Sequence, residues 1–314
     1  MIRSSIDLGT NTCLLLIADW DDARQEVDRV VEDHSTIVRL GQDVDRSRIL
    51  AEEAVERTLA CLHVYAERVR ALGLDPANTM AVATATARDA SNGAEFFARV
   101  GRETGFRFRT LTGEEEARFT FLGGLLPGVD PSRSAVIDIG GGSTELMSRS
   151  GGLSVDLGSV RFTERFLKSD PVLDAEFWAC QEAVDQALSR FLPIRAQMAP
   201  ETDLVAVAGT ATTLAAYFLG LAKFDAPAIN EVILSRGDVH RMVEELKWRS
   251  HEERKRLAGV ESGRADVLLA GALILWRSME LLQFPKCRVS TRGLRFGVFA
   301  ASPEMTRGLV LGSS

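Results

Sequence analysis

Two short glycine-containing runs carry the side chains best suited to chemistry in this sequence of 314 residues. Each run follows an aspartate in an apolar stretch: Asp7 precedes Gly9–Thr12, and Asp138 precedes Gly140–Thr144. A carboxylate in a buried strand is costly unless a partner compensates its charge. Glycine allows close approach of a ligand, and successive N–H groups with neighbouring hydroxyls can bind an oxyanion. The pattern predicts a place for phosphate and a hard cation; a tight hairpin turn with an edge aspartate is the alternative interpretation.

A second pair of similar segments follows the first. Ala81–Ala87 (AVATATA) resembles Ala206–Thr212 (AVAGTAT), and the two pairs are separated by similar lengths of chain. Two matched motifs in the same order indicate two related lobes, each with an Asp-Gly turn and a later threonine-rich turn. The candidate phosphate ligands in these turns are Gly9, Thr10, Asn11, Thr12, Gly140, Gly141, Gly142, Ser143, Thr144, Gly209 and Thr210.

Strands and helices alternate around these landmarks. Strands are expected at 13–18, 27–39, 79–83, 135–139, 204–208 and 287–290. Helices are expected at 51–72, 92–104, 160–168, 174–197, 211–221, 237–249, 264–282 and 293–300. This order predicts an α/β chain with two mixed-sheet lobes and a cleft between them. The run Pro127–Pro131 is the natural seam, which gives a first domain at 1–126 and a second at 127–314.

The net charge, the apolar segments and the cysteines argue against several classes of protein. The formal net charge of −7 argues against a general nucleic-acid binder, which usually carries a basic excess. No apolar segment approaches the length of a membrane span, and neither a signal peptide nor a membrane partner is expected. The four scattered cysteines form no CxxC pair, so reduced thiols in a cytoplasmic protein are expected.

Five elements, taken in order, resemble the exopolyphosphatase and guanosine pentaphosphate phosphatase (Ppx/GppA) family of the actin/Hsp70/acetate-kinase superfamily. They are Asp7–Asn11 (DLGTN), Thr84–Arg88 (TATAR), Gly113–Arg118 (GEEEAR), Asp138–Leu146 (DIGGGSTEL) and Gly293–Arg295 (GLR). The resemblance implies two ribonuclease-H-like domains flanking an interdomain cleft, in the short two-domain form, with a last helix that could pack back on the first domain. One departure is Ala208–Thr212 (AGTAT), where many members have a GASGT version.

The resemblance also implies roles for the acidic residues. Asp138 and Glu145 would hold Mg²⁺ (or Mn²⁺), directly or through its waters, with Asp7 in the same shell. Thr112 and Glu115 fit a capping box at the start of a helix, which explains Glu115 structurally. Glu116 directly precedes Ala-Arg and is the candidate general base, with Glu115 as the fallback.

Arginines complete the candidate site. Arg88, at the end of the first threonine-rich turn, could grip phosphate oxygens with two parallel hydrogen bonds, and we include it with the catalytic residues. Arg264 and Arg295 are further candidates for binding a polyanion. An ordinary surface arginine is the alternative interpretation of Arg88.

The function implied is an exopolyphosphatase that releases terminal phosphate from inorganic polyphosphate by metal-assisted attack of water. Guanosine pentaphosphate hydrolysis at the 5′ end is the first alternative, since both substrates end in the same anhydride. An actin-like ATPase or phosphotransferase is a more remote alternative, and a non-catalytic sensor of either polyanion is a further class. The sequence leaves a homodimer open.

Overall fold

The computed structural model describes residues 1–24 and 26–300, apart from the side chains of Ala87, Arg88 and Ala300. The chain forms two compact units. Unit 1 comprises Met1–Gly123 and the segment that starts at Leu294, and unit 2 comprises Gly124–Gly293. Each unit is built around its own mixed sheet.

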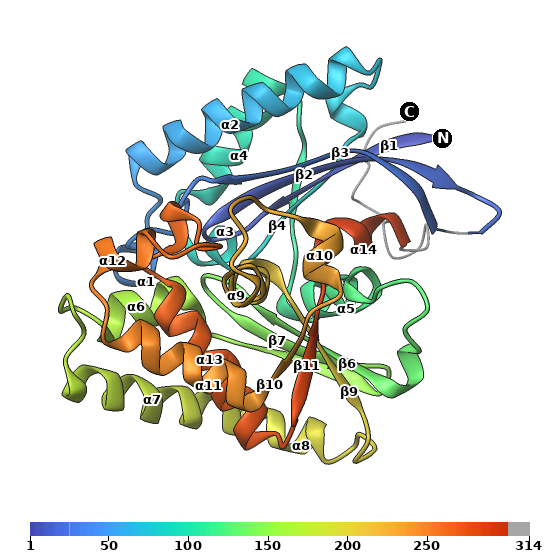
Figure 1. Cartoon of the computed structure of the whole chain (residues 1–314). Helices are drawn as coiled ribbons and strands as arrows, with labels where there is room; N and C mark the ends of the chain where they lie inside the picture. Colours follow the sequence, from blue (N-terminus) through green and yellow to red (C-terminus); the bar gives the residue numbers. More distant parts are fainter. Residues whose placement is uncertain (25, 301–314) are drawn as a thin grey trace. The chain divides into compact units, whose positions relative to one another are not determined.

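Unit 1 contains a sheet with the strand order β3-β2-β1-β4-β5 (Figure 1). β1 pairs antiparallel with β2 and parallel with β4, so the sheet joins an antiparallel meander to a parallel half. Its strands are β1 (Ile2–Leu8), β2 (Thr12–Asp21), β3 (Glu26–Ile37), β4 (Met80–Ala83) and β5 (Phe108–Thr110). Its helices are α1 (Val44–Ser47), α2 (Glu52–Ala71), α3 (Ala85–Asp89), α4 (Gly93–Thr104), α5 (Gly113–Gly124) and α14 (Leu294–Ala300).

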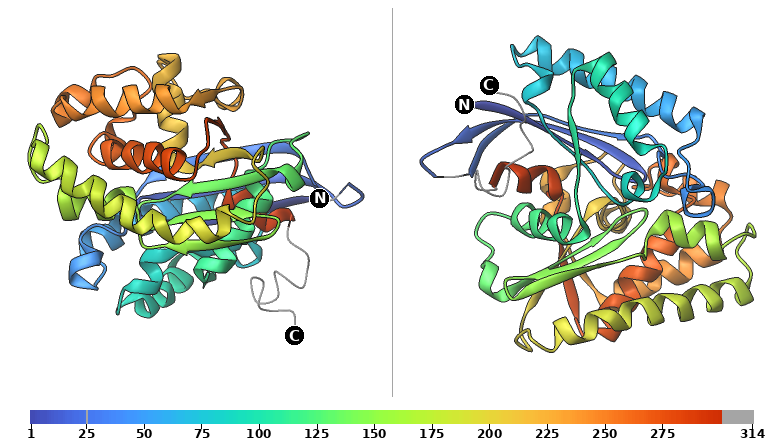
Figure 2. Two further views of the ribbon diagram at one scale, coloured as in Figure 1. Left: turned by 90° about the horizontal axis from the view of Figure 1, so that it is seen from below. Right: turned by 180° about the vertical axis from the view of Figure 1, so that it is seen from behind.

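The two faces of this sheet are covered by different helices. Alternation along a strand sends successive side chains to opposite faces. Ile6 and Leu8 of β1 pack in the cluster that contains α2 and α4, which Figures 1 and 2 show side by side. Leu16 of β2 packs on the other face in a cluster with Phe119 of α5 and Phe299 of α14.

Unit 2 contains a sheet with the strand order β10-β11-β9-β6-β7-β8. Its strands are β6 (Ser134–Ile139), β7 (Thr144–Ser148), β8 (Gly151–Val155), β9 (Asp203–Val207), β10 (Ile233–Ser235) and β11 (Lys286–Val289). Its helices are α6 (Ser159–Phe166), α7 (Asp174–Leu188), α8 (Leu192–Arg195), α9 (Ala208–Leu219), α10 (Ala226–Asn230), α11 (Arg236–Lys247), α12 (His251–Lys255) and α13 (Leu268–Leu281).

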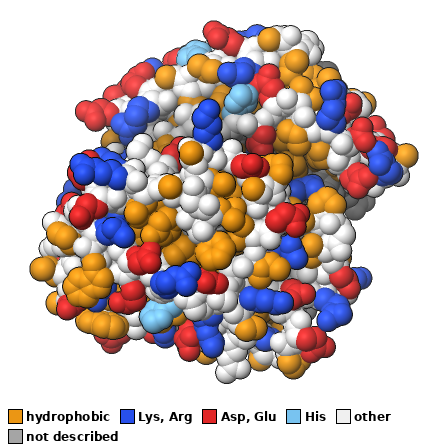
Figure 3. Space-filling view, in the orientation of Figure 1, with side chains coloured by type: hydrophobic (Ala, Val, Ile, Leu, Met, Phe, Trp, Pro, Cys, Tyr) orange, Lys and Arg blue, Asp and Glu red, His pale blue; other side chains and the backbone are white. Residues whose placement is uncertain are grey.

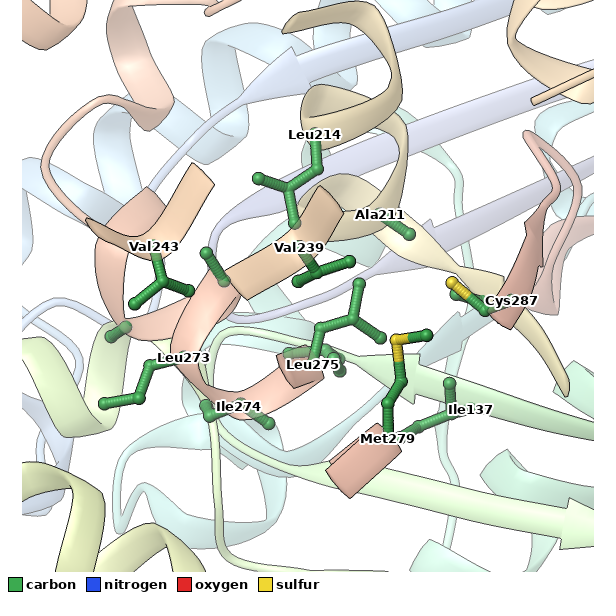
Figure 4. Packing of buried hydrophobic residues seen from close by; sticks show 14 of the residues in the cluster. Ile137, Ala211, Leu214, Val239, Val243, Leu273, Ile274, Leu275, Met279 and Cys287 are labelled. Carbon is green, nitrogen blue, oxygen red and sulfur yellow. The ribbon is translucent and has the colours of Figure 1, made fainter. Parts of the chain in front are cut away.

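The core of unit 2 lies between its sheet and its helices. Ile137 of β6, Leu214 of α9 and Leu275 of α13 belong to one buried cluster, and Figure 4 shows them with Val239 of α11 and Cys287 of β11. α13 is apolar on nearly every side because it is buried on nearly every side, as expected for a central helix. This packing holds β6 rigidly, and β6 carries Asp138 to the edge of the core.

The predicted internal repeat is confirmed by the pairing of the strands. β1 and β6 each pair antiparallel with the next strand of their own hairpin, and each pairs parallel with the strand that precedes the threonine-rich turn, β4 or β9. The α/β class with two mixed sheets is therefore confirmed as well.

Some predicted elements are wrong in their extent. The single helix expected at 174–197 is three pieces: α7, a 3₁₀ turn at Ser189–Phe191 and α8. Pro193 lacks the N–H that would continue the helical hydrogen-bond pattern, so the helix tightens and restarts there. The short strands β5, β8 and β10 were not predicted, because three to five residues with Gly, Ser and Arg give little alternation to detect.

Charged side chains of both signs are interspersed over the face seen in Figure 3. Within the part of the chain that the structure describes, helices long and apolar enough to cross a membrane are absent.

The close approach of α14 to α5 gives a test of this fold. A Cβ added at Gly297 of α14 would overlap the backbone carbonyl of Phe119 in α5, and a backbone group cannot move aside cheaply. We expect Gly297→Ala to lower the free energy of unfolding by about 2 kcal/mol or more, despite the better helix propensity of alanine.

Gly293→Ala is the matched control, since nothing lies within 4 Å of a Cβ placed there. We expect this change to alter stability by no more than about 0.5 kcal/mol. Urea unfolding of the two variants measures the difference, and equal stabilities would contradict the contact between α5 and α14.

Candidate functional site

The two predicted glycine runs form the same turn in both units. In unit 1, the Gly9 N–H donates to the Thr12 carbonyl at 2.9 Å and closes a two-residue loop between β1 and β2. In unit 2, the Gly140 N–H donates to the Ser143 carbonyl at 3.0 Å and closes the equivalent loop between β6 and β7. The hairpin turn that we weighed as the alternative is therefore present, but its edge aspartate is not: Asp7 and Asp138 lie on β1 and β6, which are interior strands of their sheets.

The carbonyl groups of the second turn are held by the segment that follows β8. The Gly140 carbonyl accepts from the Ser159 N–H at 2.9 Å, the Gly141 carbonyl from the Val160 N–H at 3.0 Å, and the Gly142 carbonyl from Arg161 Nε at 2.8 Å. In a trans peptide the C=O of one residue and the N–H of the next point in opposite directions. The N–H groups of residues 141, 142 and 143 are thus turned to the other side, as an anion-binding nest requires.

The first turn is held in the same way. The Thr10 carbonyl accepts from the Gly41 N–H at 2.8 Å, and the Asn11 carbonyl accepts from the N–H groups of Val38 and Arg39 at 3.0 Å each. The N–H groups of Asn11 and Thr12 are therefore turned away from this anchoring segment.

Glycine is required where each anchoring segment meets its turn. A Cβ at Gly41 would overlap the Thr10 side chain and lie 2.6 Å from Thr86 Oγ1. A Cβ at Gly158 would overlap the Gly141 carbonyl. Each turn is thus fixed from behind by a neighbour that comes closer than any side chain would allow.

Two carboxylates of unit 1 lie together beside the first turn. Asp7 is at the end of β1 and Glu116 is in the first turns of α5, where it is 8% exposed. Burial raises the pKa of the Asp7 carboxyl to about 7, the charge of Glu116 adds to the rise, and the Arg295 guanidinium partly offsets it. A half-buried acid with a strongly raised pKa beside a second, buried acid is typical of functional sites.

The structure distinguishes the neighbouring glutamates of α5. The predicted capping box is confirmed: the Thr112 N–H donates to Glu115 Oε2 at 2.9 Å, and the Glu115 N–H donates to Thr112 Oγ1 at 3.2 Å. Glu115 also pairs with Arg109. Glu115 is therefore occupied in stabilising the start of the helix, whereas Glu116 is buried near Asp7.

Asp138 and Glu145 of unit 2 are direct partners across β6 and β7. Residues opposite each other in an antiparallel pair project from the same face, and two like charges there destabilise the pair. Glu145 is 2% exposed, and its Oε1 accepts a hydrogen bond from Ser154 Oγ at 2.6 Å.

This arrangement fits a hard divalent cation. Carboxylate oxygens are the ligands that Mg²⁺ takes from proteins, and the ion keeps several waters, so two adjacent carboxylates are a sufficient protein contribution. The opposing negative charges would then be compensated. Across residues 1–24 and 26–300, the structure brings no three His, Cys, Asp or Glu side chains together as a metal-binding group. Asp7 belongs to unit 1, and its place in the same metal shell stays a prediction.

In unit 1 the threonine-rich turn contacts the glycine turn directly. Thr86 Oγ1 donates to Thr10 Oγ1 at 2.7 Å in unit 1. In unit 2, a Cβ at Gly209 would overlap the guanidinium of Arg264, which also pairs with Glu261 at 2.8 Å. Three candidate residues of unit 2, Gly209, Thr210 and Arg264, are therefore gathered around the start of α9.

The departure at Ala208 coincides with an unusual backbone. Ala208 has φ 66°, in the left-handed region. A residue with a Cβ pays about 1 kcal/mol or more in that region, whereas glycine does not. Many members of the family that this chain resembles have glycine at this position, which is the residue that the backbone conformation favours. The alanine here therefore introduces local backbone strain at the candidate site.

Other candidates have different surroundings from those expected. The Thr144 hydroxyl is buried and donates to the Leu157 carbonyl, so it supports the hairpin. Arg88 lies on α3, but its side chain is outside the described part of the structure. Arg295 is buried and holds Asp33 of β3 with two hydrogen bonds of 2.9 Å.

The sequence reasoning missed three residues that contact the candidate site: Asp33, Ser154 and Arg161. Asp33 lies in a highly charged strand that resembles a solvated face, and nothing near it marks a partner 262 positions away. None of the sequence motifs includes or adjoins Ser154, so nothing marked it as a candidate. The one available signal was Arg161, a charged residue among the apolar residues of an amphipathic helix.

Known proteins are similar to this chain over most of its length. A family model described as the Ppx/GppA phosphatase family matches residues 18–304. Exopolyphosphatase 2 of Mycobacterium tuberculosis is 34% identical over 87% of this chain and 88% of its own length. A bifunctional 3-dehydroquinate synthase/phosphatase of Fusobacterium nucleatum is 29% identical over 87% of this chain, which spans only 42% of that protein.

Further relatives include a guanosine-5′-triphosphate,3′-diphosphate pyrophosphatase of Vibrio vulnificus, which is 29% identical over 95% of this chain and 58% of its own length. Among solved structures, an exopolyphosphatase-like protein superposes with a TM-score of 0.86 at 29% identity, over 95% of this chain and 97% of that one. A Ppx/GppA enzyme of Aquifex aeolicus gives a TM-score of 0.78 at 31% identity, over 96% and 99% of the two chains.

The raised pKa of Asp7 predicts a pH-dependent cost to stability. The unfolded carboxyl ionises near pH 3.9, whereas the folded one ionises near pH 7, so the native state loses stability as the pH rises through this window. In EDTA, Asp7→Asn should be more stable than the native sequence at pH 8 by on the order of 2–4 kcal/mol, and the gap should shrink towards pH 4.

Thermal unfolding at both pH values measures this gap, and Asp156→Asn, a change at an exposed carboxylate, is the control. A gap of the same size at pH 4 and pH 8 would show that the Asp7 carboxyl is not held in a costly environment.

Proposed function

The chain belongs to the Ppx/GppA phosphatase family, and on that premise we propose that it is an exopolyphosphatase that removes terminal phosphate from inorganic polyphosphate by attack of water. Relatives of this chain are named as exopolyphosphatases and as a guanosine pentaphosphate pyrophosphatase, which are phosphoanhydride hydrolases. The observation that supports the mechanism is the close approach of the half-buried Asp7 and the buried Glu116 beside the turn at Gly9–Thr12.

Phosphate binding is assigned to the turns of both units. The N–H groups turned away from the anchoring segments are preorganised donors for phosphoryl oxygens, so they need not reorganise as charge develops. In unit 1 these N–H groups are those of Asn11 and Thr12, and in unit 2 those of residues 141, 142 and 143. Gly9, Thr10, Gly140 and Thr144 are kept as candidates that shape the two turns, since the N–H groups of Gly9 and Gly140 close the hairpins. Gly209, Thr210 and Arg264 are assigned to the same polyanion, and Arg88 is retained as a candidate phosphate clamp.

The family implies a divalent metal ion, and we assign Mg²⁺ (or Mn²⁺) to Asp138 and Glu145, with Asp7 as a further ligand. The bound ion would offset the negative charge of the phosphoryl oxygens and of the carboxylates that hold it. The hydrogen bond from Ser154 orients the Glu145 carboxylate, which would hold the ion directly or through its waters. A cation next to Asp7 would favour the ionised form of that carboxyl.

Glu116 acts as the general base. Its carboxylate accepts a proton from the attacking water, whose oxygen forms the new bond to the terminal phosphorus while the bridging P–O bond breaks. The products are orthophosphate and a chain shorter by one phosphate. Burial of Glu116 next to Asp7 supports this assignment, because a base held away from bulk water keeps a defined orientation.

Hydrolysis of guanosine pentaphosphate is the second candidate function. The similarity to the Vibrio vulnificus pyrophosphatase favours it, and the reaction at the terminal anhydride would be the same. We prefer polyphosphate because the more similar mycobacterial relative, which this chain also spans more completely, is named an exopolyphosphatase. The four cysteines are all free and buried, which supports placing the protein in the reducing cytoplasm.

One activity panel tests the substrate assignment. With Mg²⁺ present, phosphate release is measured from polyphosphates of several lengths and from guanosine pentaphosphate, using one enzyme preparation. We expect the larger kcat/KM on polyphosphate. A preference of tenfold or more for guanosine pentaphosphate would make that nucleotide the substrate instead, and rapid ATP turnover without either activity would favour an ATPase.

The base assignment is tested by changing neighbouring glutamates separately. Glu116→Gln should lower kcat by about 10²–10⁴-fold, because the amide cannot accept the proton, while polyphosphate binding remains largely intact. Glu115→Gln keeps the capping-box acceptor and removes the ion pair with Arg109, so it should cost no more than about 1 kcal/mol of stability, with kcat within tenfold of the native value. Unchanged turnover in Glu116→Gln would remove this residue from the mechanism.

A further inference from the structure

Arg295 is held in a fixed orientation by three segments of unit 1. Its Nε and Nη2 donate to Asp33 Oδ1 and Oδ2 at 2.9 Å each, so one edge of the guanidinium matches both carboxylate oxygens. Its own carbonyl accepts from Ser5 Oγ at 2.8 Å. The side chain is 10% exposed, and the Phe296 ring lies 5.0 Å from its Cζ. A partly buried bidentate pair of this kind specifies geometry as well as charge.

This pair lies next to the two acids of the candidate site. Ser5 and Asp7 are separated by two positions on β1 and therefore project from the same face of the sheet. The Arg295 guanidinium is close enough to Asp7 to act on its charge. Gly297 lies against the backbone of Phe119, which is one helical turn after Glu116 on α5. The segment that carries Arg295 is thus packed directly against the segment that carries Glu116.

We propose that Asp33 and Arg295 form a positioning pair for Asp7 and Glu116, and that Arg295 does not bind the substrate phosphate. The edge of the guanidinium that would grip a phosphate with two parallel hydrogen bonds is already matched to Asp33. Asp33 thereby sets where the positive charge of Arg295 is placed relative to Asp7 and Glu116. This inference rests on the proposed function, because it concerns the orientation of the proposed base.

The role of Asp33 follows from what its loss would leave behind. A buried guanidinium that loses its carboxylate partner is attracted to other acids. Asp7 lies within the electrostatic reach of Arg295, and Glu116 in turn lies close enough to Asp7 to act on its charge. A new pair with either acid would take away the base or the metal ligand. If Arg295 bound phosphate instead, removal of Asp33 would free the guanidinium edge formed by Nε and Nη2, which could then donate two hydrogen bonds to the substrate.

The two roles predict opposite kinetic effects of Asp33→Asn. As a positioning residue, Asp33 affects the chemical step, so the substitution lowers kcat by about 10–100-fold with KM within threefold of the native value. As a competitor for a phosphate ligand, its removal lowers KM and leaves kcat unchanged. The measurement is steady-state phosphate release from polyphosphate with Mg²⁺.

A chemically matched pair elsewhere in the chain separates positioning from stability. Arg277 Nε and Nη2 donate to Asp185 Oδ1 and Oδ2 at 2.7 and 2.9 Å in unit 2. The side chains of that pair are 16% and 31% exposed, against 10% and 34% for Arg295 and Asp33. We expect Asp33→Asn and Asp185→Asn to lower the melting temperature by similar amounts, and only Asp33→Asn to lower kcat. Equal effects on kcat would overturn the proposal.

Arg295→Lys provides a second measurement, since an ammonium cannot reproduce the two-hydrogen-bond match. We expect the kcat loss of Asp33→Asn, of Arg295→Lys and of the double variant to be alike within threefold, as for residues that act as one unit. A tenfold or larger rise in KM for Arg295→Lys with unchanged kcat would identify Arg295 as a phosphate ligand and overturn the proposal.

The failure of the proposed function has a different signature. A native enzyme that prefers guanosine pentaphosphate changes the substrate, and the same variants are then compared on that substrate. A native enzyme without activity on either anhydride refutes the proposed function and the positioning role together, before any variant is compared.

Discussion

Unit 1 holds two carboxyl groups close together, the half-buried Asp7 and the buried Glu116, and the contacts around them must offset the energetic cost. Asp7 and Glu116 come from a strand and a helix that are far apart in the sequence, and burial with mutual repulsion raises the pKa of Asp7 to about 7. Folding alone would select against such a pair. The surrounding contacts limit this cost: Arg295 supplies the opposite charge, Asp33 fixes the arginine, and the Ser5 hydroxyl fixes the backbone of α14. A site of this kind trades stability for reactivity.

Unit 2 uses the same scaffold with a different arrangement of charge. The central strand, the two-residue turn and the anchoring segment correspond between the units, and in both the turn carbonyls are held from behind. In unit 2, however, the second acid comes from the partner strand of the hairpin and not from a helix. Cross-strand carboxylates with one oxygen held by Ser154 suit a cation, whereas the helix-borne Glu116 suits proton transfer. One duplicated fold thus offers two chemically distinct acid pairs.

Backbone groups are as important as side chains in both turns. Gly41 and Gly158 allow the anchoring segments to approach so closely that the turn carbonyls are satisfied internally, and the N–H groups are left on the opposite side. Because the donors are main-chain groups of a rigid hairpin, they are oriented before substrate arrives, and binding does not have to order them. This explains why the anchoring segments carry glycine at positions 41 and 158: a Cβ there would overlap the turn.

The sequence alone determined the features that depend on local pattern. The apolar strands ending in glycine turns, their repetition and the capping box at Thr112 and Glu115 are all readable from residue order, and with them the α/β class. The proposal of Glu116 as the base came from the family resemblance, and the capping box only accounted for Glu115. Only the tertiary structure decided which distant residues support the site. Asp33 with Arg295, Gly209 with Arg264 and Ser154 with Glu145 meet because strands and helices pack together, and the choice of partner depends on register and close approach, which no spacing along the chain records.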